Sequence, residues 1–305
     1  MRVILISQDK EFDNKRLNLI KRYAKVNWIK KDKINLKEVK ELFNPDEKIL
    51  ALSPVPLNWT LPKDIYKKFR NVKYICVPTT GYDFIDLNEC KKFNIKITSV
   101  PYYSTNAVAE YAIFLMVALH KKLAVQIKKE FRYEFSQETL MDEFRNKSVG
   151  IVGLGHIGNR IAELTINLGM KTYYWSRKNK NNKFTHLELE ELLSTVDVVF
   201  PTLIVNNDTS KILTTNLLSK VKTTSYVIDV THGLTDPNYL IKKVEQNKLA
   251  GYAFESDKLK IKNFKGNVLI TSPLAWFTKQ SLENNIQIWA ETIISCLKGK
   301  PKNLV

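Results

Sequence analysis

The residues best suited to chemistry include a glycine-rich turn at 153–158, with the sequence Gly-Leu-Gly-His-Ile-Gly. It follows an apolar run at 149–152 and opens an apolar helical pattern, the context in which GxGxxG spacing binds a dinucleotide. The first glycine permits the tight turn, the second lets the backbone approach a pyrophosphate, and the third allows close packing of helix on strand. The amides and positive dipole end at the helix start would bind the anion. The predicted contacts are Gly153, Gly155, His156, Ile157 and Gly158.

The next strand along the chain ends in residues that bear on the choice of nicotinamide cofactor. An NAD site carries Asp or Glu there, about 20 residues after the glycines, to bind the ribose 2′-hydroxyl. Residues 173–178 have the sequence Tyr-Tyr-Trp-Ser-Arg-Lys, without a carboxylate. Ser176 can donate to a 2′-phosphate, Arg177 can pair with it or stack on adenine, and Lys178 adds charge. The pattern favours NADP(H) over NAD(H), the alternative being a solvated basic loop.

Two series of strands and helices are expected to position these residues. In the first hundred residues, apolar runs alternate with helical patterns at 14–23 and 36–43. Strands are expected there at 3–6, 49–52, 74–77 and 95–98. Further strands are expected at 149–152, 171–175, 196–200, 226–230, 251–254 and 268–270, separated by helices at 157–168, 187–193 and 239–246. The rhythm predicts an α/β fold with two Rossmann-like, doubly wound parallel sheets.

Two longer helical patterns and a polar stretch complete the chain. The pattern at 105–122 is apolar almost all round in its middle, which predicts burial between layers or at an interface. His120, at its end, is expected at the surface. Residues 126–146 are polar and mixed, as in an excursion or arm, and 278–297 forms a long last helix. We predict a first domain of residues 1–100 plus 279–305 and a dinucleotide-binding domain of residues 101–278.

Composition narrows the classes of function. The formal charge is +17, but 40 of the 48 basic residues are Lys, spread along the chain, which argues against bidentate nucleic-acid contacts and leaves a small anionic molecule as partner. The longest apolar run, 112–119, is far shorter than the ~20 residues of a membrane helix. The first residues do not resemble a signal peptide, so we expect a cytoplasmic protein. Three widely spaced cysteines indicate neither a disulfide framework nor a metal site.

Several motifs, in order and spacing, resemble those of the D-isomer-specific 2-hydroxyacid dehydrogenase family. Besides the glycine turn, they are VPTTGYDFID (77–86), VPYYSTNAVAE (100–110), FPT (200–202), IDVTHG (228–233), LAGYAF (249–254) and NVLITSPLAWFT (267–278). The resemblance covers nearly the whole chain. It implies a split substrate domain, a cofactor domain in the middle, a cleft between them, and a homodimer built around residues 105–146.

The resemblance also implies contacts for substrate and cofactor. Backbone amides near Thr80 and Gly81 would hold a substrate carboxylate, although this turn could simply link strand to helix. Trp276 would wall the pocket or pack in an interface, and Tyr102 would donate from its phenol or pack. The implied cofactor contacts are Pro201, Thr202, Val230, Thr231 and Glu255.

Three positions depart from the family's catalytic set of Arg, Glu and His. His232 occupies the Arg position and Pro273 the His position. In an ungapped match Lys260 falls at the Glu position, with Glu255 upstream, where the family's Asp touches the nicotinamide amide; a gap would instead bring Glu255 or Asp257 into play. His232 could donate a hydrogen bond or act as an acid, or only fill the space left by Arg. Pro273 has no proton to give, so the family's usual acid–base route is absent.

These observations support two main hypotheses of function. The first is an NADP(H)-dependent oxidoreductase that transfers hydride to a C=O, C=N or C=C bond of a small anionic substrate, with His232 as the catalytic group. The alternative is a catalytically silent NADP(H)-binding sensor or scaffold, because the phosphate-binding turn is kept while the acid–base pair is lost. A nucleic-acid or anionic-surface binder rests on the net charge alone.

Overall fold

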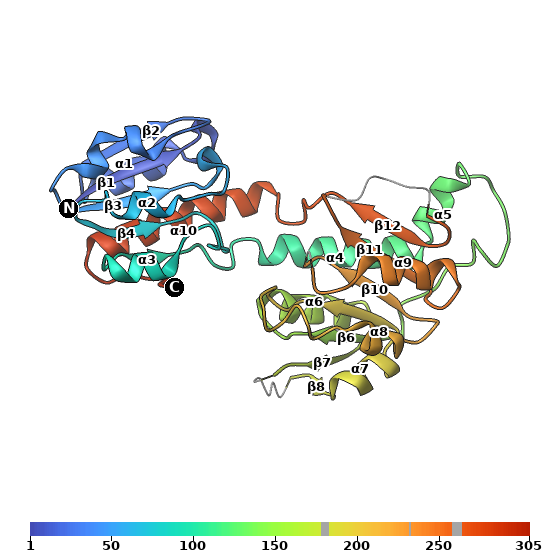
Figure 1. Cartoon of the computed structure of the whole chain (residues 1–305). Helices are drawn as coiled ribbons and strands as arrows, with labels where there is room; N and C mark the ends of the chain where they lie inside the picture. The colour runs from blue at the N-terminus through green and yellow to red at the C-terminus, as the bar shows by residue number, and fades with distance from the viewer. Residues whose placement is uncertain (178–182, 232, 258–263) are drawn as a thin grey trace. The chain divides into compact units, whose positions relative to one another are not determined.

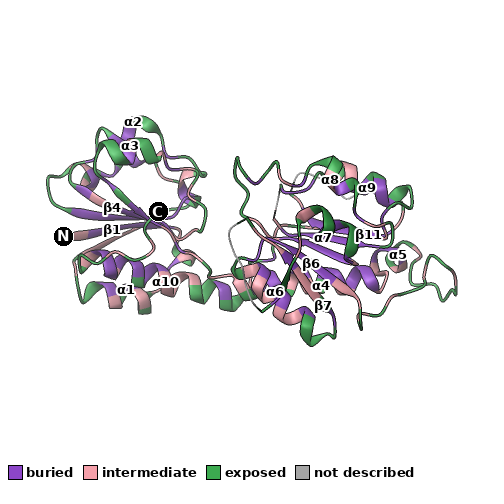
Figure 2. Cartoon of the chain, turned by 90° about the horizontal axis from the view of Figure 1, so that it is seen from below, coloured by how far each residue is buried: buried purple, intermediate pink, exposed green. Residues whose placement is uncertain are grey.

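The structure, a computed structural model, describes residues 1–177, 183–231, 233–257 and 264–305. The described chain forms two compact units, Met1–Ser104 with Lys279–Val305, and Thr105–Thr278 (Figure 1). Each unit has its own parallel sheet, whose strands are mostly buried while the outer faces of the helices are exposed (Figure 2). The α/β fold with two parallel sheets is confirmed. The predicted strands of both units lie within two residues of observed ones.

The first unit has a five-stranded sheet in the order β2-β1-β3-β4-β5, with every neighbouring pair parallel. The strands are β1 (Arg2–Ser7), β2 (Val26–Lys30), β3 (Lys48–Leu52), β4 (Val72–Cys76) and β5 (Lys96–Thr98). The helices are α1 (Asn14–Lys21), α2 (Lys63–Tyr66), α3 (Leu87–Lys92) and α10 (Lys279–Leu297). Val3 and Leu5 of β1 pack in one cluster with Trp289 of α10, whereas Ile4 and Ile6 pack in another. Apolar side chains therefore cover both faces of the sheet.

The last helix, α10, joins this unit through contacts far apart in the sequence. Its Trp289 is fully buried, and the indole Nε1 donates to the Cys76 carbonyl at 3.0 Å. Sγ atoms of Cys76 and Cys296 lie 3.9 Å apart. Both thiols, like that of Cys90, are free and buried.

Two local predictions in the first unit need correction. The segment 36–43 is not one helix but two 3₁₀ turns, Leu36–Glu38 and Lys40–Phe43. Val39 between them has φ −84° and ψ 86°, outside the helical region, so the pattern is interrupted there. The edge strand β2 was missed because its sequence, VNWIK, is mixed and its residues are only partly buried.

The second unit has a seven-stranded sheet in the order β12-β11-β10-β9-β6-β7-β8, again with every pair parallel. The strands are β6 (Ser148–Val152), β7 (Lys171–Trp175), β8 (Thr185–His186), β9 (Val198–Pro201), β10 (Tyr226–Asp229), β11 (Gly251–Glu255) and β12 (Val268–Thr271). The helices are α4 (Thr105–His120), α5 (Leu123–Lys128), α6 (His156–Asn167), α7 (Leu189–Thr195), α8 (Thr215–Ser219) and α9 (Pro237–Glu245). The strand order reverses at β6, whose neighbours are β7 and β9.

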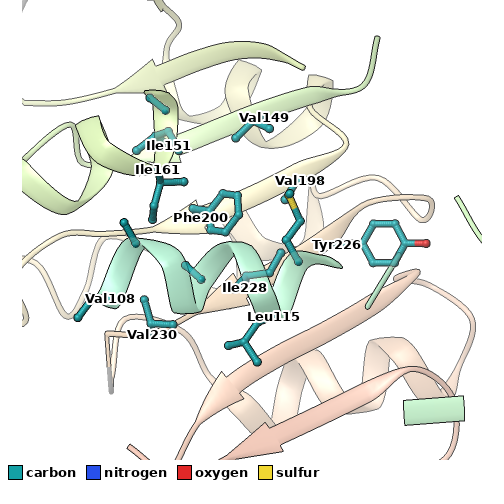
Figure 3. Packing of buried hydrophobic residues seen from close by; sticks show 14 of the residues in the cluster. Val108, Leu115, Val149, Ile151, Ile161, Val198, Phe200, Tyr226, Ile228 and Val230 are labelled. Carbon is teal, nitrogen blue, oxygen red and sulfur yellow. The ribbon is translucent and has the colours of Figure 1, made fainter. Parts of the chain in front are cut away.

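Helix α4 lies in the main core of this unit. Val108 and Leu115 of the helix pack in one cluster with Phe200 of β9 and Ile228 of β10 (Figure 3). The predicted burial of its apolar middle is confirmed. The surface position expected for His120 is wrong, because its side chain is fully buried and stacks on Tyr226 with ring centroids 4.1 Å apart.

Residues 129–147 follow α5 and contain neither helix nor strand. Several of their large apolar side chains are exposed. Among the described residues, no helix is both long and apolar enough to cross a bilayer, and no three His, Cys, Asp or Glu side chains gather as a metal site would need.

Candidate functional site

The glycine turn lies where the strand order reverses. Val152, the last residue of β6, pairs with Trp175 of β7 on one side and Pro201 of β9 on the other. The next residue, Gly153, has φ +106°, a conformation that side chains disfavour. Ligands of open α/β sheets bind at the carboxyl ends of the strands on either side of such a reversal.

The space around the three glycines fits a bound pyrophosphate. A Cβ added to Gly155 would meet no heavy atom within 4 Å, so the backbone there is open to a ligand. A Cβ on Gly158 would overlap the Gly153 carbonyl oxygen and lie 2.8 Å from Thr202 Oγ1. Gly155 is the N-cap of α6 and has no capping side chain, so the helix start can accept an anion. The neighbouring His156 is exposed and Ile157 half-buried.

Thr202, the residue after β9, fixes the glycine turn from the adjacent strand. Its hydroxyl donates to the Gly153 carbonyl at 2.5 Å, and its amide donates to the Val152 carbonyl at 2.9 Å. Pro201 before it is buried. Thr202 was predicted to contact the cofactor, and the contacts in the structure are with the turn that would hold it.

Ser176 and Arg177 follow β7 at the same edge of the sheet. The preceding carbonyl, that of Trp175, accepts the Gly153 amide at 2.9 Å, so the end of β7 is bonded directly to the glycine turn. Ser176 is half-buried and Arg177 exposed. Lys178 lies outside the described residues. Ser176 and Arg177, two of the three residues predicted to contact a 2′-phosphate, therefore come directly after Trp175, which is hydrogen-bonded to the glycine turn.

A buried carboxylate organises the loop after β10. Asp229 accepts hydrogen bonds from the amide and hydroxyl of Thr231 at 2.8 and 2.5 Å, and from those of Thr235 at 3.2 and 2.5 Å. Val230, which lies between Asp229 and Thr231 in the sequence, is buried. His232, the predicted catalytic residue, lies outside the described residues.

A second buried carboxylate, Glu255, ends β11. Its Oε1 accepts the backbone amides of Leu274 and Ala275, each at 2.8 Å. The loop that it binds follows β12 and contains Pro273 and Trp276. Trp276 is exposed, with its ring edge-on to Phe277 at 5.3 Å. Glu255 was predicted to contact the cofactor; the structure shows it bound to this loop.

A cavity of about 370 Å³ lies beside the two carboxylates. It lies at the carboxyl ends of β10 and β11, next to the loop after β12. Its lining includes Asp229, Thr235, Tyr252, Glu255, Asp257 and Pro273. Pro273 therefore borders a cavity that is also lined by three carboxylic residues, Asp229, Glu255 and Asp257.

Candidates in the first unit lie on the turns after β4 and β5. Thr80 and Gly81 are exposed, and the Thr80 hydroxyl donates to the Val100 carbonyl at 2.9 Å. Within the described chain, neither of their amides donates a hydrogen bond, which leaves both available to an anion or to water. Tyr102 is exposed with φ +63°.

Sequence reasoning did not identify Asp229, Thr235 and Tyr252 as a connected group. The Tyr252 hydroxyl lies 2.8 Å from Thr235 Oγ1, which in turn binds Asp229. A partial signal existed, because Asp followed two residues later by Thr is typical of a turn held by the Asp side chain. The longer-range contact with β11 left no signal in the sequence.

Comparison with known proteins identifies the family of the second unit. The family model for the NAD-binding domain of D-isomer-specific 2-hydroxyacid dehydrogenases matches residues 113–271, which is more than half of the chain. A hydroxypyruvate reductase of Blautia hydrogenotrophica is 26% identical over 296 residues, covering 90% of this chain and 90% of that protein.

Solved structures match along the whole chain, and two of them are described here. An acyclic imino acid reductase in complex with NADPH and D-Arg has a TM-score of 0.83 and 26% identity, with complete coverage of both chains. A glyoxylate reductase from Paecilomyes thermophila has a TM-score of 0.85 and covers 100% of this chain and 98% of that one. At 22% identity, the second match supports the fold alone.

Proposed function

The chain belongs to the D-isomer-specific 2-hydroxyacid dehydrogenase family, and on that premise we propose that it is an NADP(H)-dependent reductase of a small anionic substrate with an atypical active site. The observation that carries the proposal is the glycine turn at the strand reversal, with open space at Gly155 and an uncapped helix start behind it. A dinucleotide fits there, and when bound it would supply the hydride.

The preference for NADP(H) is supported by the residues that follow β7. Arg177 is exposed at the edge that holds the glycine turn, and Ser176 precedes it, where an NAD site would carry a carboxylate. A guanidinium and a hydroxyl both favour a 2′-phosphate. A cytoplasmic location, where NADP is kept mostly reduced, would favour the direction of reduction.

Of the C=O, C=N and C=C bonds, a protonated C=N fits the residues best. Reduction of a ketone needs a proton at oxygen as well as a hydride at carbon, and Pro273 offers none where the family carries its His. A protonated imine already carries its proton on nitrogen. Hydride addition to its carbon moves the C=N electron pair onto nitrogen and yields a neutral amine without further proton transfer.

The charges around the cavity support the same choice. Glu255 and Asp257 line it beside Pro273, and carboxylates stabilise a nearby cation. In the first unit, the backbone amides of Thr80 and Gly81 would bind a carboxylate. The similar structure of an acyclic imino acid reductase with NADPH adds support. His232 would donate a hydrogen bond to the substrate.

The test is NADPH consumption at 340 nm with a panel of 2-oxo acids, the same acids mixed with amines, and enones. We expect turnover with the amine mixtures, a lower rate with NADH, and a collapse of turnover in His232→Ala. Binding of NADPH would be measured in parallel by fluorescence. Tight binding without turnover on any substrate would instead favour a silent NADP(H)-binding sensor or scaffold, and absence of NADPH binding would overturn both.

A further inference from the structure

Two buried carboxylates at the ends of neighbouring strands each bind the backbone of a loop at the site. Asp229 ends β10 and Glu255 ends β11, and both line the same cavity. We propose that they are positioning residues, which hold the loops 229–235 and 272–277 in the geometry that the reaction needs. The inference rests on the proposed function, since it assigns a role in that site.

The bonds of Asp229 fix the loop at two points. Both oxygens are used, Oδ1 by Thr231 and Oδ2 by Thr235. Thr235 has one hydroxyl proton, and because it is donated to the carboxylate, the Tyr252 hydroxyl must donate to Thr235 Oγ1. The two anchored residues, Thr231 and Thr235, lie on either side of residue 232 in the sequence. The hydrogen bond between Tyr252 and Thr235 connects the loop to β11.

Glu255 anchors the other loop with a single oxygen. Two consecutive amides, of Leu274 and Ala275, converge on Oε1 at 2.8 Å. Leu274 is exposed, whereas Ala275 is buried in the core cluster of this unit. Glu255 as a whole residue is 4% exposed, and burial strengthens hydrogen bonds to its carboxylate because water competes little.

Asp229 is not explained by an ion pair, because no Lys or Arg of the described chain forms a salt bridge with it. A buried charge that is stabilised mainly by backbone amides and hydroxyls costs desolvation energy, and this cost is offset only while all of these donors stay in place. The loop geometry and the charge therefore depend on each other.

Asp197 provides a matched control in the same sheet. Its Oδ2 accepts the amide and hydroxyl of Ser148, each at 2.8 Å, and its Oδ1 accepts Lys222 Nζ. It precedes β9 and therefore lies at the amino ends of the strands, the edge opposite the site. Asp197→Asn disturbs a similar carboxylate anchor without touching either loop.

The first experiment is hydrogen exchange at single amides, which needs no activity. Asp229→Asn should speed exchange of the Thr231 and Thr235 amides about tenfold or more. The side-chain NH₂ of Asn replaces one acceptor oxygen and would face a backbone N–H and a hydroxyl that both donate. Glu255→Met should do the same at Ala275, whereas Glu255→Gln keeps an oxygen acceptor and should restore protection. The Leu274 amide also donates to the Ser272 carbonyl at 2.7 Å, so its exchange should change less. Asp197→Asn should speed exchange of the Ser148 amide and leave exchange of the four loop amides unchanged.

The second experiment is steady-state kinetics with the substrate that the wild type reduces. We expect kcat to fall about 10- to 100-fold in Asp229→Asn and Glu255→Met. The kcat of Asp197→Asn should stay within about twofold of the wild type, because Asp197 lies at the opposite edge of the sheet. Thr231→Val and Thr235→Val, which remove one hydroxyl each, serve if Asp229→Asn does not fold.

The outcomes separate the inference from the proposed function. Wild-type kcat together with faster loop exchange would show anchoring without a role in the reaction, and unchanged exchange would show that the carboxylates do not hold the loops; either result overturns the inference. An equal loss of kcat in Asp197→Asn would also overturn it, since general destabilisation would then explain the effect. Absence of turnover in the wild type would overturn the proposed function. Amide hydrogen exchange would still test whether the two carboxylates hold the loops.

Discussion

Arg177 is the single residue on which the choice between NADPH and NADH depends most. It is exposed after β7, and a charge-assisted pair with a 2′-phosphate stabilises a complex by about 1.5–3 kcal/mol. Arg177→Ala should therefore weaken NADPH binding about 10- to 100-fold and leave NADH binding nearly unchanged. Fluorescence titration with both cofactors measures the ratio.

The control for this substitution is Lys171→Ala. Lys171 is also exposed and begins the same strand, at the opposite end from Arg177. Lys171→Ala should change neither the NADPH affinity nor the NADH affinity. An equal loss of NADPH and NADH binding in Arg177→Ala would contradict a specific 2′-phosphate contact and point to stacking on the adenine.

His120 makes the stability of the second unit depend on pH. Burial lowers the pKa of its imidazole, and Nδ1 donates to the Met116 carbonyl at 2.9 Å. The native state therefore favours the neutral ring, whereas an unfolded His takes up a proton near pH 6.5. The stability contributed by His120 is complete above about pH 6.5 and is lost as the pH falls below it.

Thermal or urea unfolding at pH 8 and pH 5 tests this sign. The wild type should lose more stability between the two values than His120→Phe, which keeps an aromatic ring against Tyr226. His186→Phe is the control, because His186 is exposed on β8 and should follow the wild type. A wild type that gains stability at pH 5 relative to His120→Phe would contradict the prediction.

At the scale of elements, the connection between β6 and α6 requires its glycines for different reasons. Gly158→Ala would force a methyl group against the Gly153 carbonyl, and overpacking of this kind costs about 1–3 kcal/mol. Gly155→Ala places a methyl group in open space, so stability should change by less than about 1 kcal/mol. Its effect should appear in NADPH affinity, about tenfold weaker, because the methyl occupies the pyrophosphate's approach.

Urea unfolding and NADPH titration of both variants separate the two roles. The expected pattern is a stability defect in Gly158→Ala and a binding defect in Gly155→Ala. If Gly155→Ala bound NADPH like the wild type, the ligand would not approach that backbone. The proposed placement of the cofactor would then be wrong.

The elements that hold the site could be predicted because their signals are local. Strands β6 and β10 are short apolar runs, and the needs of Gly153 and Gly158 are met only by glycine. The segment 36–43 had a helical pattern but carries a break at Val39 that depends on its surroundings. The role of Glu255 could not be predicted, because its partners Leu274 and Ala275 lie on the loop after the next strand. The partners of Asp229 are close in sequence, and only the contact of Thr235 with Tyr252 crosses to another strand.

The buried polar groups, like Glu255, depend on contacts between distant parts of the chain and could not be predicted from local signals. His120 stands beside two lysines in the sequence, which predicts exposure, yet its partner Tyr226 is brought against it only when β10 packs on α4. Cys76 and Cys296 likewise meet across 220 positions of sequence. Pairings set by tertiary packing leave no periodic pattern that the sequence could reveal.

At the scale of the whole molecule, the two most exposed large apolar side chains among the described residues lie in the segment 129–147, called the arm below. Tyr133 is 91% and Phe135 88% exposed, with ring centroids 5.1 Å apart, and Phe131 and Leu140 are also exposed. Neighbouring aromatic side chains left in water mark a surface that is covered by a partner. The segment overlaps residues 105–146, which the family resemblance assigns to a homodimer, so we propose a second copy of this chain as the partner.

Light scattering coupled to size exclusion measures the mass that decides this. We expect a dimer for the wild type and a monomer for the double variant Tyr133→Asp with Phe135→Asp, because two charges cannot be buried unpaired in an apolar interface. Tyr23→Asp is the control, since Tyr23 is an exposed aromatic residue of the first unit, outside the arm, and should leave the dimer intact. Both units should stay folded in the double variant, because these side chains contribute little to either core. A wild type that is monomeric at the highest measurable concentration would leave the arm without a partner copy and would contradict the proposal.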